Sequence, residues 1–538
     1  MASPPHKFLF LSMKSCRTLA PLGALLIFLK LAAHQLHLPG PHYDEAVEII
    51  PAMQLLLGQP VEAFRGAGIW LGGRLFPIMV VDYIGALNTY LTLPLFAALD
   101  VSVFAMRLMP IFVALVTLAL TYRLGRELAD ERVALAALYL LAVNPSFVFW
   151  SRQGIFVTSI TAPILLALVL CWLRWHQGRG NRYLYAAAFL GGLGLYAKFL
   201  FLWGIVALGA SHLLLTRREG LLRLVREMRQ PWLLLTLFLC FLAGIWPLIL
   251  FNIQTGGTIA TFMGNALSSY YGVNNLAFWA NLRARLEGFT ALVEGSHFWY
   301  LGGAFANRLY PLYLAASLVL AVIPRRRTDK GTASLSLRLL PFLMLALVIL
   351  QSCFTISALW ITHYALIVPL IPLAVAVGWM RWDKRVAAMA LLLLGAFDVN
   401  VDLHYHIALA HTGGHSAHSD AIYDLSGYLL IANQRQPLAM DWGIKAPVQL
   451  LTKGRINPLE VFGYEWEADE AFKERIKPFF SDPAKLYIFR SPEDAVFKRW
   501  EAFQEAVEEE GKKAVLKATI RERSGRPLFL VYEVKGGP

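Results

Sequence analysis

The chain has 538 residues, of which 57% are hydrophobic and only 16% charged, a balance that excludes an ordinary soluble protein of this length. Its formal net charge is +13, yet the part from His404 onward carries 18 basic and 19 acidic residues. The excess positive charge therefore lies in the apolar part, which is typical of membrane-protein loops rather than of nucleic-acid binding. Cys16, Cys171, Cys240 and Cys353 all lie in or beside apolar runs, which excludes a disulfide framework in the tail.

Apolar runs long enough to cross a bilayer recur from Leu19 to about Val401. A transmembrane helix needs roughly 20 apolar residues, and hydropathy predicts about eleven such helices. The predicted spans are residues 19–36, 106–122, 133–149, 155–173, 184–196, 199–215, 233–251, 309–323, 339–357, 364–380 and 386–401. We therefore expect residues 1–403 to form an all-α polytopic membrane module, in which residues 37–105 are a long first outer loop.

Basic residues gather in alternate loops between the predicted spans. The clusters lie at residues 123–132, 174–182, 217–229, 325–338 and 381–385, and Lys7, Lys14 and Arg17 precede the first span. Cytoplasmic loops are enriched in Lys and Arg, so this side and the N-terminus are predicted to be cytoplasmic. A crossing at the short apolar stretch 86–99 would move every later cluster outward, so we expect that stretch to lie along the outer surface.

The tail has the composition of a soluble domain. Residues 404–423 are expected to be a linker, and residues 424–538 an extracytoplasmic α/β domain, because eleven crossings leave the C-terminus outside. Predicted strands cover residues 437–441, 456–462, 485–489, 514–520 and 527–534, and predicted helices cover 444–452, 468–480 and 497–510. This order predicts a small open sheet with helices.

The first outer loop begins with the most informative motif, Pro41-His42-Tyr43-Asp44-Glu45-Ala46. A helix is predicted from Asp44 to Leu57, ending at Gly58. The helix dipole favours acidic residues in the first turn, so capping is a sufficient structural explanation for both carboxylates. A catalytic role is the alternative, with Asp44 as the reacting group and Glu45 beside it.

The sequence resembles a GT-C class glycosyltransferase, in particular the glycosyltransferase 39 or RgtA/B/C/D-like group, the branch of protein O-mannosyltransferases and lipid A aminoarabinose transferases. The matching motifs follow one another over roughly residues 19–200. They are Asp44-Glu45-Ala46, Met53 with Leu57-Gly58, Arg74-Leu75-Phe76-Pro77, Tyr83-Ile84-Gly85-Ala86-Leu87, Tyr90, Pro94, Ala105-Met106-Arg107-Leu108, Leu124-Gly125-Arg126-Glu127-Leu128, and Asn144-Pro145-Ser146 with Ser151-Arg152. Further along the chain the resemblance is mostly topological.

The resemblance implies an inverting enzyme that takes a sugar from a polyprenyl- or dolichyl-phosphate donor at the outer face. The acidic residue matching Asp44 would be the general base on the acceptor hydroxyl. The chemistry is consistent, because an attacking hydroxyl must lose its proton, and a positioned carboxylate can accept it. The phosphate leaving group needs cations or hydrogen-bond donors rather than an acid.

Further residues are candidates for binding the donor phosphate or the substrate. They are Arg74, Asp82, Tyr83, Arg152, Lys198, His363 and Tyr364. Arg152 and Lys198 lie at predicted outer ends of spans, where snorkelling to the membrane surface is the alternative. Arg74 stands where the aminoarabinose transferases carry Glu-Lys-Pro-Pro, and His363 replaces the arginine of an Arg-Tyr pair, so its charge would depend on pH. An exposed interfacial position is the alternative for Asp82.

No metal site and no cofactor is predicted, although some GT-C enzymes use a divalent cation. The histidines His404, His406, His411, His415 and His418 lie near Asp402 and Asp420. Histidines and carboxylates are common metal ligands, but a glycine-containing linker that is rich in histidine by chance is the simpler explanation.

The sequence thus predicts a multi-pass glycosyltransferase of the plasma (inner) membrane. Its expected partners are a polyprenyl-phosphate sugar donor, a lipid, glycan or protein acceptor, and membrane lipids, without nucleic acid. The alternative is a transporter or flippase of lipid-linked sugars that has no transferase activity. Transporters typically carry internal repeats and ionisable residues at the membrane centre, and the sequence shows no strong repeat. A scaffold whose tail binds partners is a third possibility.

Overall fold

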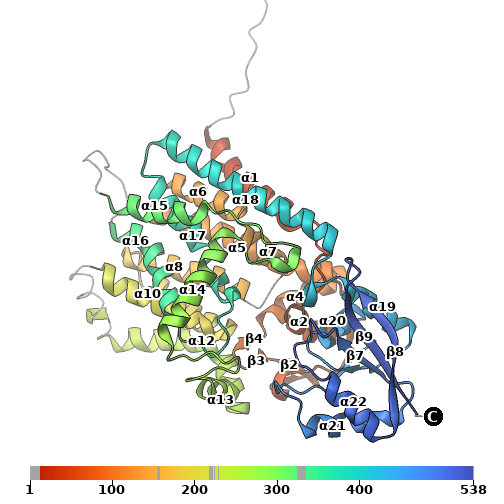
Figure 1. Cartoon of the computed structure of the whole chain (residues 1–538). Coiled ribbons are helices and arrows are strands. Elements are labelled where there is room, and N and C mark those ends of the chain that lie inside the picture. The colour runs from red at the N-terminus through yellow and green to blue at the C-terminus, as the bar shows by residue number, and fades with distance from the viewer. Residues whose placement is uncertain are drawn as a thin grey trace, which may run out of the picture.

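The computed structural model describes residues 13–153, 158–216, 222, 225–227, 229–323 and 335–536. Helices form a large bundle, and a tail that contains a sheet lies at one end of it (Figure 1). The first outer loop, coloured orange in Figure 1, lies between the bundle and the tail. Lys7 and most of the basic clusters at 217–229 and 325–338 fall outside the described residues.

A helix coincides with each predicted span. The helices are α1 (Met13–Ala32), α5 (Val103–Leu128), α6 (Glu131–Ala142), α7 (Pro145–Gln153), α8 (Thr158–His176), α9 (Arg182–Ala197), the short 3₁₀ helix η2 (Phe199–Phe201), α10 (Leu202–Leu215), α12 (Pro231–Thr255), α15 (Tyr310–Val322), α16 (Leu335–Gln351), η4 (Ile361–Ile367), α17 (Leu370–Trp379) and α18 (Lys384–Thr412). The prediction of a mostly helical membrane module is confirmed.

The number of crossings stays a prediction. Among the described residues, three helices are long and apolar enough to cross a membrane, and two bent pairs raise the number to five. The bends are 60° between α6 and α7 and 54° between η4 and α17. A proline lies at each bend, since Pro145 begins α7 and Pro369 directly precedes α17, and proline has no backbone N–H to continue the hydrogen bonds of the preceding helix.

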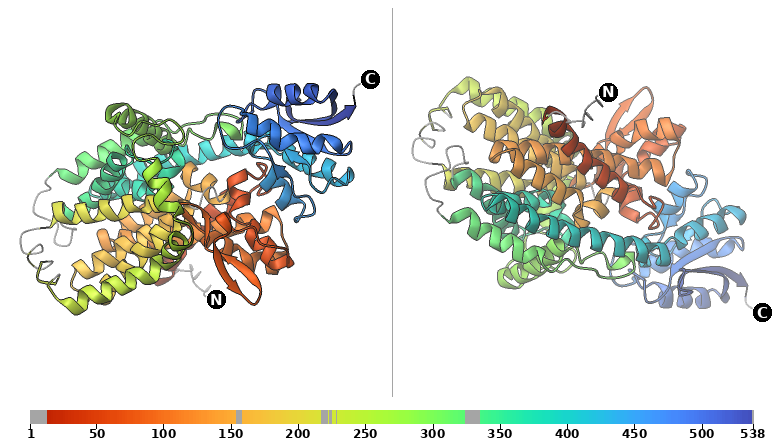
Figure 2. Two further views of the ribbon diagram at one scale, coloured as in Figure 1. Left: turned by 90° about the horizontal axis from the view of Figure 1, so that it is seen from below. Right: turned by 90° about the horizontal axis from the view of Figure 1, so that it is seen from above.

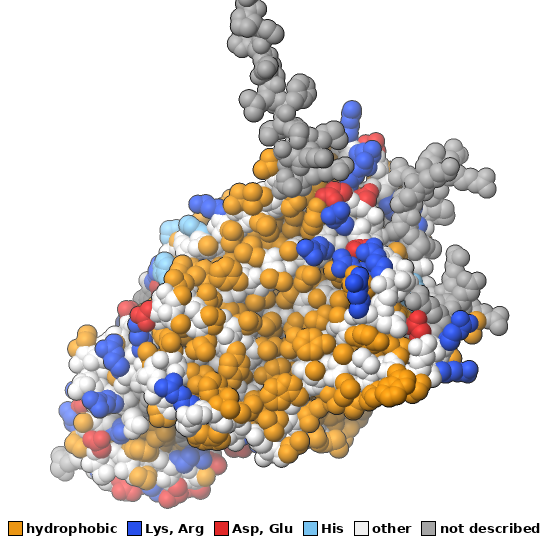
Figure 3. All heavy atoms as spheres, turned by 180° about the vertical axis from the view of Figure 1, so that it is seen from behind, with side chains coloured by type: hydrophobic (Ala, Val, Ile, Leu, Met, Phe, Trp, Pro, Cys, Tyr) orange, Lys and Arg blue, Asp and Glu red, His pale blue; other side chains and the backbone are white. Residues whose placement is uncertain are grey.

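The surface of the bundle is apolar, as a lipid environment requires. Large apolar side chains face outward along α12, where Trp232 is 79% and Ile253 77% exposed. Figure 3 shows a broad face covered by hydrophobic side chains, with many Lys and Arg side chains at the end away from the tail. Such a large exposed apolar surface is not tolerated in water, so the chain is a multi-pass membrane protein.

The first outer loop folds into several short elements. They are α2 (Tyr43–Val47), α3 (Ile50–Leu57), β1 (Gly68–Leu71), β2 (Arg74–Pro77), β3 (Met79–Val81), β4 (Ile84–Gly85) and α4 (Leu87–Leu99). The prediction of one continuous helix from Asp44 to Leu57 is wrong, because Pro51 occupies the first turn of α3, and proline fits there but not in a helix interior. The β1–β2 hairpin was not predicted; Gly72 and Gly73 both have positive φ in its turn.

The tail contains a five-stranded sheet in the order β6-β5-β7-β9-β8. Its strands are β5 (Leu438–Ala439), β6 (Leu459–Glu460), β7 (Leu486–Arg490), β8 (Lys512–Arg521) and β9 (Pro527–Gly536), and its helices are α19 (Ala421–Ile431), α20 (Lys445–Leu451), α21 (Glu470–Ile476) and α22 (Trp500–Glu509). The predicted α/β order is confirmed. Helix α18 continues to Thr412, however, and ends at Gly413 in the left-handed conformation, so helix occupies part of the predicted linker 404–423.

The tail is attached to the first outer loop by side-chain contacts. The Tyr43 hydroxyl donates to Glu460 Oε1 at 2.9 Å, and Lys445 Nζ lies 2.9 Å from Glu62 Oε2. In both views of Figure 2 the blue tail lies beside the orange loop. The tail thereby forms one wall of the region around Asp44.

Candidate active site

Asp44 lies in the first turn of α2, where its side chain is 30% exposed. The backbone N–H of Asp44 donates to His42 Nδ1 at 3.3 Å, so His42 supplies the cap of this helix. Burial lowers the pKa of His42 to about 3, which leaves the ring neutral and able to accept this bond. Because another residue caps the helix, capping does not account for the Asp44 carboxylate.

The surroundings of Asp44 favour a proton acceptor that works near neutral pH. Burial raises the pKa of Asp44 to about 7, although the positive charge of Lys198 acts in the opposite direction. A general base is most effective when its pKa lies near the working pH. The pKa of the Tyr83 phenol is also raised, to about 12, mainly by burial and further by neighbouring groups including Asp44. Tyr83 is therefore a neutral hydrogen-bonding group.

Lys198 is buried between the end of α9 and η2. Its backbone forms an antiparallel bridge with Ile84, and the next residue, Phe199, donates its N–H to the Tyr83 carbonyl at 3.0 Å. A Cβ at Gly85 would lie 2.4 Å from the Tyr196 carbonyl oxygen, so only glycine permits this close approach. The bridge brings Lys198 within electrostatic range of Asp44 and Glu48.

A cavity of about 360 Å³ opens beside these residues. Tyr83, Lys198, Ser357 and His363 contribute polar groups to its wall. The apolar part of the wall includes Phe199, Leu202, Trp203, Phe262 and Phe354. The structure thus brings three of the predicted binding residues, Tyr83, Lys198 and His363, to one cavity with an apolar wall.

Arg285, which the sequence analysis did not single out, lies behind this cavity. It belongs to α14 (Phe278–Glu294), is buried, and donates to the carbonyls of Ser352 at 2.9 Å and Trp360 at 3.2 Å. Its guanidinium lies over the rings of Trp203 and Tyr364, and its Nη2 has no partner among the described residues. Arg285 lies in the same stretch as Arg283, and no sequence pattern distinguished the two arginines.

Tyr364 supports the cavity from behind rather than lining it. Its hydroxyl shares a 2.8 Å hydrogen bond with Ser352 Oγ, and its side chain is fully buried. Of the predicted His363-Tyr364 pair, His363 therefore faces the cavity, whereas Tyr364 holds Arg285 in place.

Glu45 and Arg152 form buried contacts at the start of the first outer loop. Glu45 Oε1 lies 2.8 Å from both Nε and Nη2 of Arg107, which also donates to the Pro39 carbonyl at 2.8 Å. Arg152 Nη2 donates to the Gln35 carbonyl at 2.7 Å, and its Nη1 lies 3.2 Å from His406 Nδ1. Neither residue is part of the cavity wall; both fix the chain that leads to Asp44.

Asp82 and Arg74 also lie outside the cavity. Arg65 donates twice to Asp82, at 2.7 and 2.8 Å, and the Thr261 hydroxyl donates to the same carboxylate at 2.7 Å. Arg74 is exposed and donates to the Leu55 carbonyl at 3.2 Å, near the end of α3. Asp82 thus joins Arg65 to Thr261 of α13 (Gly257–Gly264), and Arg74 joins β2 to α3.

The histidines at the end of α18 and directly after it do not form a common metal site among the described residues. Within the described residues, no group of three or more His, Cys, Asp or Glu side chains could hold a metal ion. The His418 ring instead stacks between His42, at 4.3 Å, and Tyr300, at 3.8 Å.

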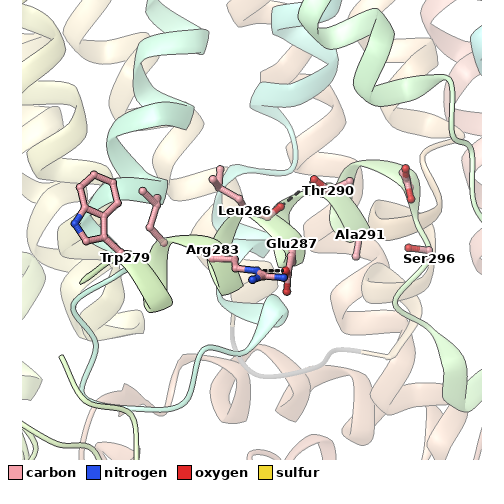
Figure 4. A pocket seen from close by; sticks show the side chains of 9 residues that line it. Trp279, Arg283, Leu286, Glu287, Thr290, Ala291 and Ser296 are labelled. Atoms are coloured by element: carbon pink, nitrogen blue, oxygen red, sulfur yellow. Dashed lines mark hydrogen bonds and ion pairs between the residues drawn. The ribbon is translucent and has the colours of Figure 1, made fainter. Parts of the chain in front are cut away.

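A second hollow lies on the exposed face of α14 (Figure 4), beside Trp279, Leu286 and Thr290. Arg283 and Glu287 pair there at 2.9 Å, one helical turn apart. None of the catalytic and donor-binding candidates named in the sequence analysis lines this hollow.

The comparisons with known proteins agree with this architecture. Residues 86–247 match the family model described as dolichyl-phosphate-mannose-protein mannosyltransferase. The fold is similar to that of ArnT from Cupriavidus metallidurans bound to undecaprenyl phosphate, with a TM-score of 0.58, 11% identity, and coverage of 97% of this chain and 98% of that chain. No curated protein matches the chain by sequence.

A second solved structure is also similar, the archaeal oligosaccharyltransferase AglB from Archaeoglobus fulgidus in complex with an inhibitory peptide and a dolichol-phosphate. The TM-score is 0.53 with 12% identity, over 89% of this chain and 69% of that chain. The chain thus has the fold of the GT-C class. The predictions of this class and of a membrane-embedded glycosyltransferase are confirmed.

Proposed function

We propose that this protein is an inverting glycosyltransferase that moves a sugar from a polyprenyl-phosphate donor to an acceptor hydroxyl at the outer face of the membrane. The observation that carries the proposal is that Lys198, in the wall of an apolar cavity, lies within electrostatic range of the Asp44 carboxylate. The solved structures of similar fold include proteins with bound undecaprenyl phosphate and dolichol-phosphate, which supports this class of donor.

The residues of the site divide the reaction between them. Asp44 takes the proton of the acceptor hydroxyl as the hydroxyl oxygen forms its bond to the anomeric carbon. The bond between that carbon and the phosphate oxygen breaks at the same time, and the polyprenyl phosphate leaves with the bonding electrons. Lys198 lies where it can stabilise the negative charge on the departing phosphate, and His363 can donate a hydrogen bond to it. Attack opposite the leaving group inverts the anomeric configuration.

The apolar wall fits the lipid part of such a donor. Phe199, Leu202 and Trp203 lie directly after Lys198 in the chain and line the same cavity, so a phosphate at Lys198 places its prenyl chain against them. Burying that chain contributes binding energy in proportion to its apolar area. No role for a metal ion is proposed.

The distribution of basic side chains also indicates how the protein is oriented in the membrane. Many Lys and Arg side chains gather at the end of the bundle away from the tail (Figure 3), and the positive-inside rule favours a cytoplasmic position for that end. Asp44, the cavity mouth and the tail then face outward, where a flipped lipid-linked donor is available.

Sugar transfer in proteoliposomes tests the proposal. Purified wild-type protein is incubated with radiolabelled polyprenyl-phosphate sugar and an envelope extract as acceptor, and Asp44→Asn is compared with Asp424→Asn, an exposed aspartate on α19. We expect Asp44→Asn to lower transfer about 10²- to 10⁴-fold and Asp424→Asn to leave it unchanged. Movement of the intact lipid across the bilayer without sugar release would contradict the transferase function and indicate a flippase.

A further inference from the structure

Five exposed aromatic side chains from three separate segments form one surface beside Asp44. This aromatic platform consists of Tyr270 and Tyr271, which follow α13 (Gly257–Gly264), Trp360 before η4, and Tyr464 and Trp466 between β6 and α21. The ring centroids of Tyr270 and Trp466 are 5.2 Å apart and those of Tyr271 and Trp360 5.9 Å apart. Every member is between 42% and 54% exposed, which is unusual for such large rings clustered together.

Hydrogen bonds hold the platform in shape. Trp466 Nε1 donates to the Tyr270 carbonyl at 3.2 Å, which ties the tail to the bundle. The side chain of Asn275 donates to the Thr355 carbonyl at 2.8 Å and accepts from the Thr355 N–H at 2.9 Å, so the segments carrying Tyr271 and Trp360 are joined. The platform is therefore preorganised, which lowers the entropic cost of binding.

A buried arginine shapes the part of the platform that the tail contributes. Arg499 donates to the carbonyls of Phe462 at 2.8 Å and Trp466 at 3.4 Å, and the Trp466 ring stacks on Phe497 at 5.4 Å. One face of the Trp466 ring thus packs against Phe497, and the hydrogen bond from Arg499 holds its backbone.

The platform adjoins the site proposed above. Burial raises the pKa of Tyr271, and the negative charge of Asp44 raises it further. Burial and Glu460 raise the pKa of Tyr464, and Asp44 adds to the effect, so both phenols lie within electrostatic range of the carboxylate. On the other side, the Trp360 carbonyl accepts from Arg285 behind the donor cavity. Asp44 is thus within electrostatic range both of Lys198 in the cavity wall and of two phenols of the platform.

The charge around the platform restricts what it can bind. The tail segment 456–472 carries Glu460, Glu465, Glu467, Asp469 and Glu470, and these carboxylates outnumber Arg475 and the buried Arg499, which contact the segment. Carboxylates at this density repel phosphorylated or carboxylated ligands. They also oppose insertion into an anionic lipid surface, which is the usual explanation for exposed Trp and Tyr near a membrane.

We propose that the aromatic platform binds uncharged sugar rings, so that the acceptor of this enzyme is a neutral glycan. Sugar rings present flat apolar C–H faces that pack on aromatic rings, while their hydroxyls bond to phenols and carboxylates at the edge. A glycan lying along the platform brings its terminal hydroxyl to Asp44. The proposal rests on the proposed transferase function, and it gives the tail a role in recognising the acceptor.

Binding of defined saccharides to the full-length protein in detergent tests the platform directly. Maltotetraose is the neutral probe and a galacturonic acid oligomer the anionic one, measured by tryptophan fluorescence and by saturation-transfer NMR. We expect the neutral probe to bind, the anionic probe not to bind, and Trp466→Ala and Trp360→Ala each to weaken binding about threefold to tenfold. Trp466→Phe should largely restore binding. Trp279→Ala, a matched exposed tryptophan on α14, is the control and should have no effect.

Several outcomes would overturn the inference. They are stronger binding of the anionic probe, no binding of the neutral one, or equal binding by wild type and Trp466→Ala. The transferase proposal has a separate test. It fails if Asp44→Asn leaves sugar transfer unchanged, regardless of the result of the saccharide-binding measurements.

Discussion

Asp44 and Lys198 lie within electrostatic range of one another across the junction between the first outer loop and the tip of the α9–α10 hairpin. The bridge between Ile84 and Lys198 makes this junction a backbone contact and not only a side-chain contact. The proposed proton acceptor, Asp44, is thereby held near Lys198, the proposed phosphate-binding cation in the cavity wall. Fixed charges of this kind stabilise a transition state without reorganising during the reaction.

The pH dependence of transfer should report the ionisation of Asp44. Its pKa is raised to about 7, and only the ionised carboxylate can accept the acceptor proton. We expect kcat/KM to fall about tenfold per pH unit below pH 7 and to level off above it. Lys198→Met removes a charge that lowers this pKa, so the midpoint should move to higher pH; an unmoved midpoint would show that another group is titrating.

Lys198→Gln should impair use of the donor. Removing a positive charge from the leaving phosphate typically costs about 10²- to 10³-fold in kcat. Lys30→Gln is the matched control, because Lys30 is an exposed lysine in the last turn of α1. Steady-state transfer with varied donor concentration distinguishes the two. Equal rates for both variants would remove Lys198 from the phosphate site.

Glu45→Gln should act on stability rather than on chemistry. Glu45 and Arg107 are a buried pair, with side chains 2% and 0% exposed, and removing one partner of such a pair costs about 3–5 kcal/mol. The exposed pair of Glu62 with Lys445 is the comparison, for which Glu62→Gln should cost about 0–1 kcal/mol. Thermal unfolding in detergent measures both. Full stability with lost transfer in Glu45→Gln would instead assign Glu45 to the chemistry.

Cysteine labelling of intact cells tests the orientation. In a variant without native cysteines, Ser481→Cys in the tail should react with an impermeant maleimide from outside, since Ser481 is exposed. Arg132→Cys lies in the first turn of α6, within the basic cluster 123–132, is exposed, and should react only after permeabilisation. The reverse pattern would place Asp44 in the cytoplasm.

Periodicity and loop charge predicted the helical bundle and the α/β tail because both are local properties of the chain. The motif carrying Asp44 was recognisable for the same reason. The contacts of Asp82 with Arg65 and of Glu45 with Arg107 depend on how distant segments meet, and no local pattern shows whether a charged side chain faces a cavity or another side chain. Arg285 was missed because its neighbours, Ser352 and Trp360, come from a later part of the chain.

The account depends on where the donor phosphate binds, and a cryo-electron microscopy structure of the protein with added polyprenyl phosphate measures that position. We predict the phosphate within hydrogen-bonding distance of Lys198 Nζ, on the Asp44 side of the cavity, with the prenyl chain along Phe199, Leu202 and Trp203. A phosphate bound elsewhere, such as in the hollow beside Trp279 on α14, with the cavity at Lys198 unoccupied, would contradict the account.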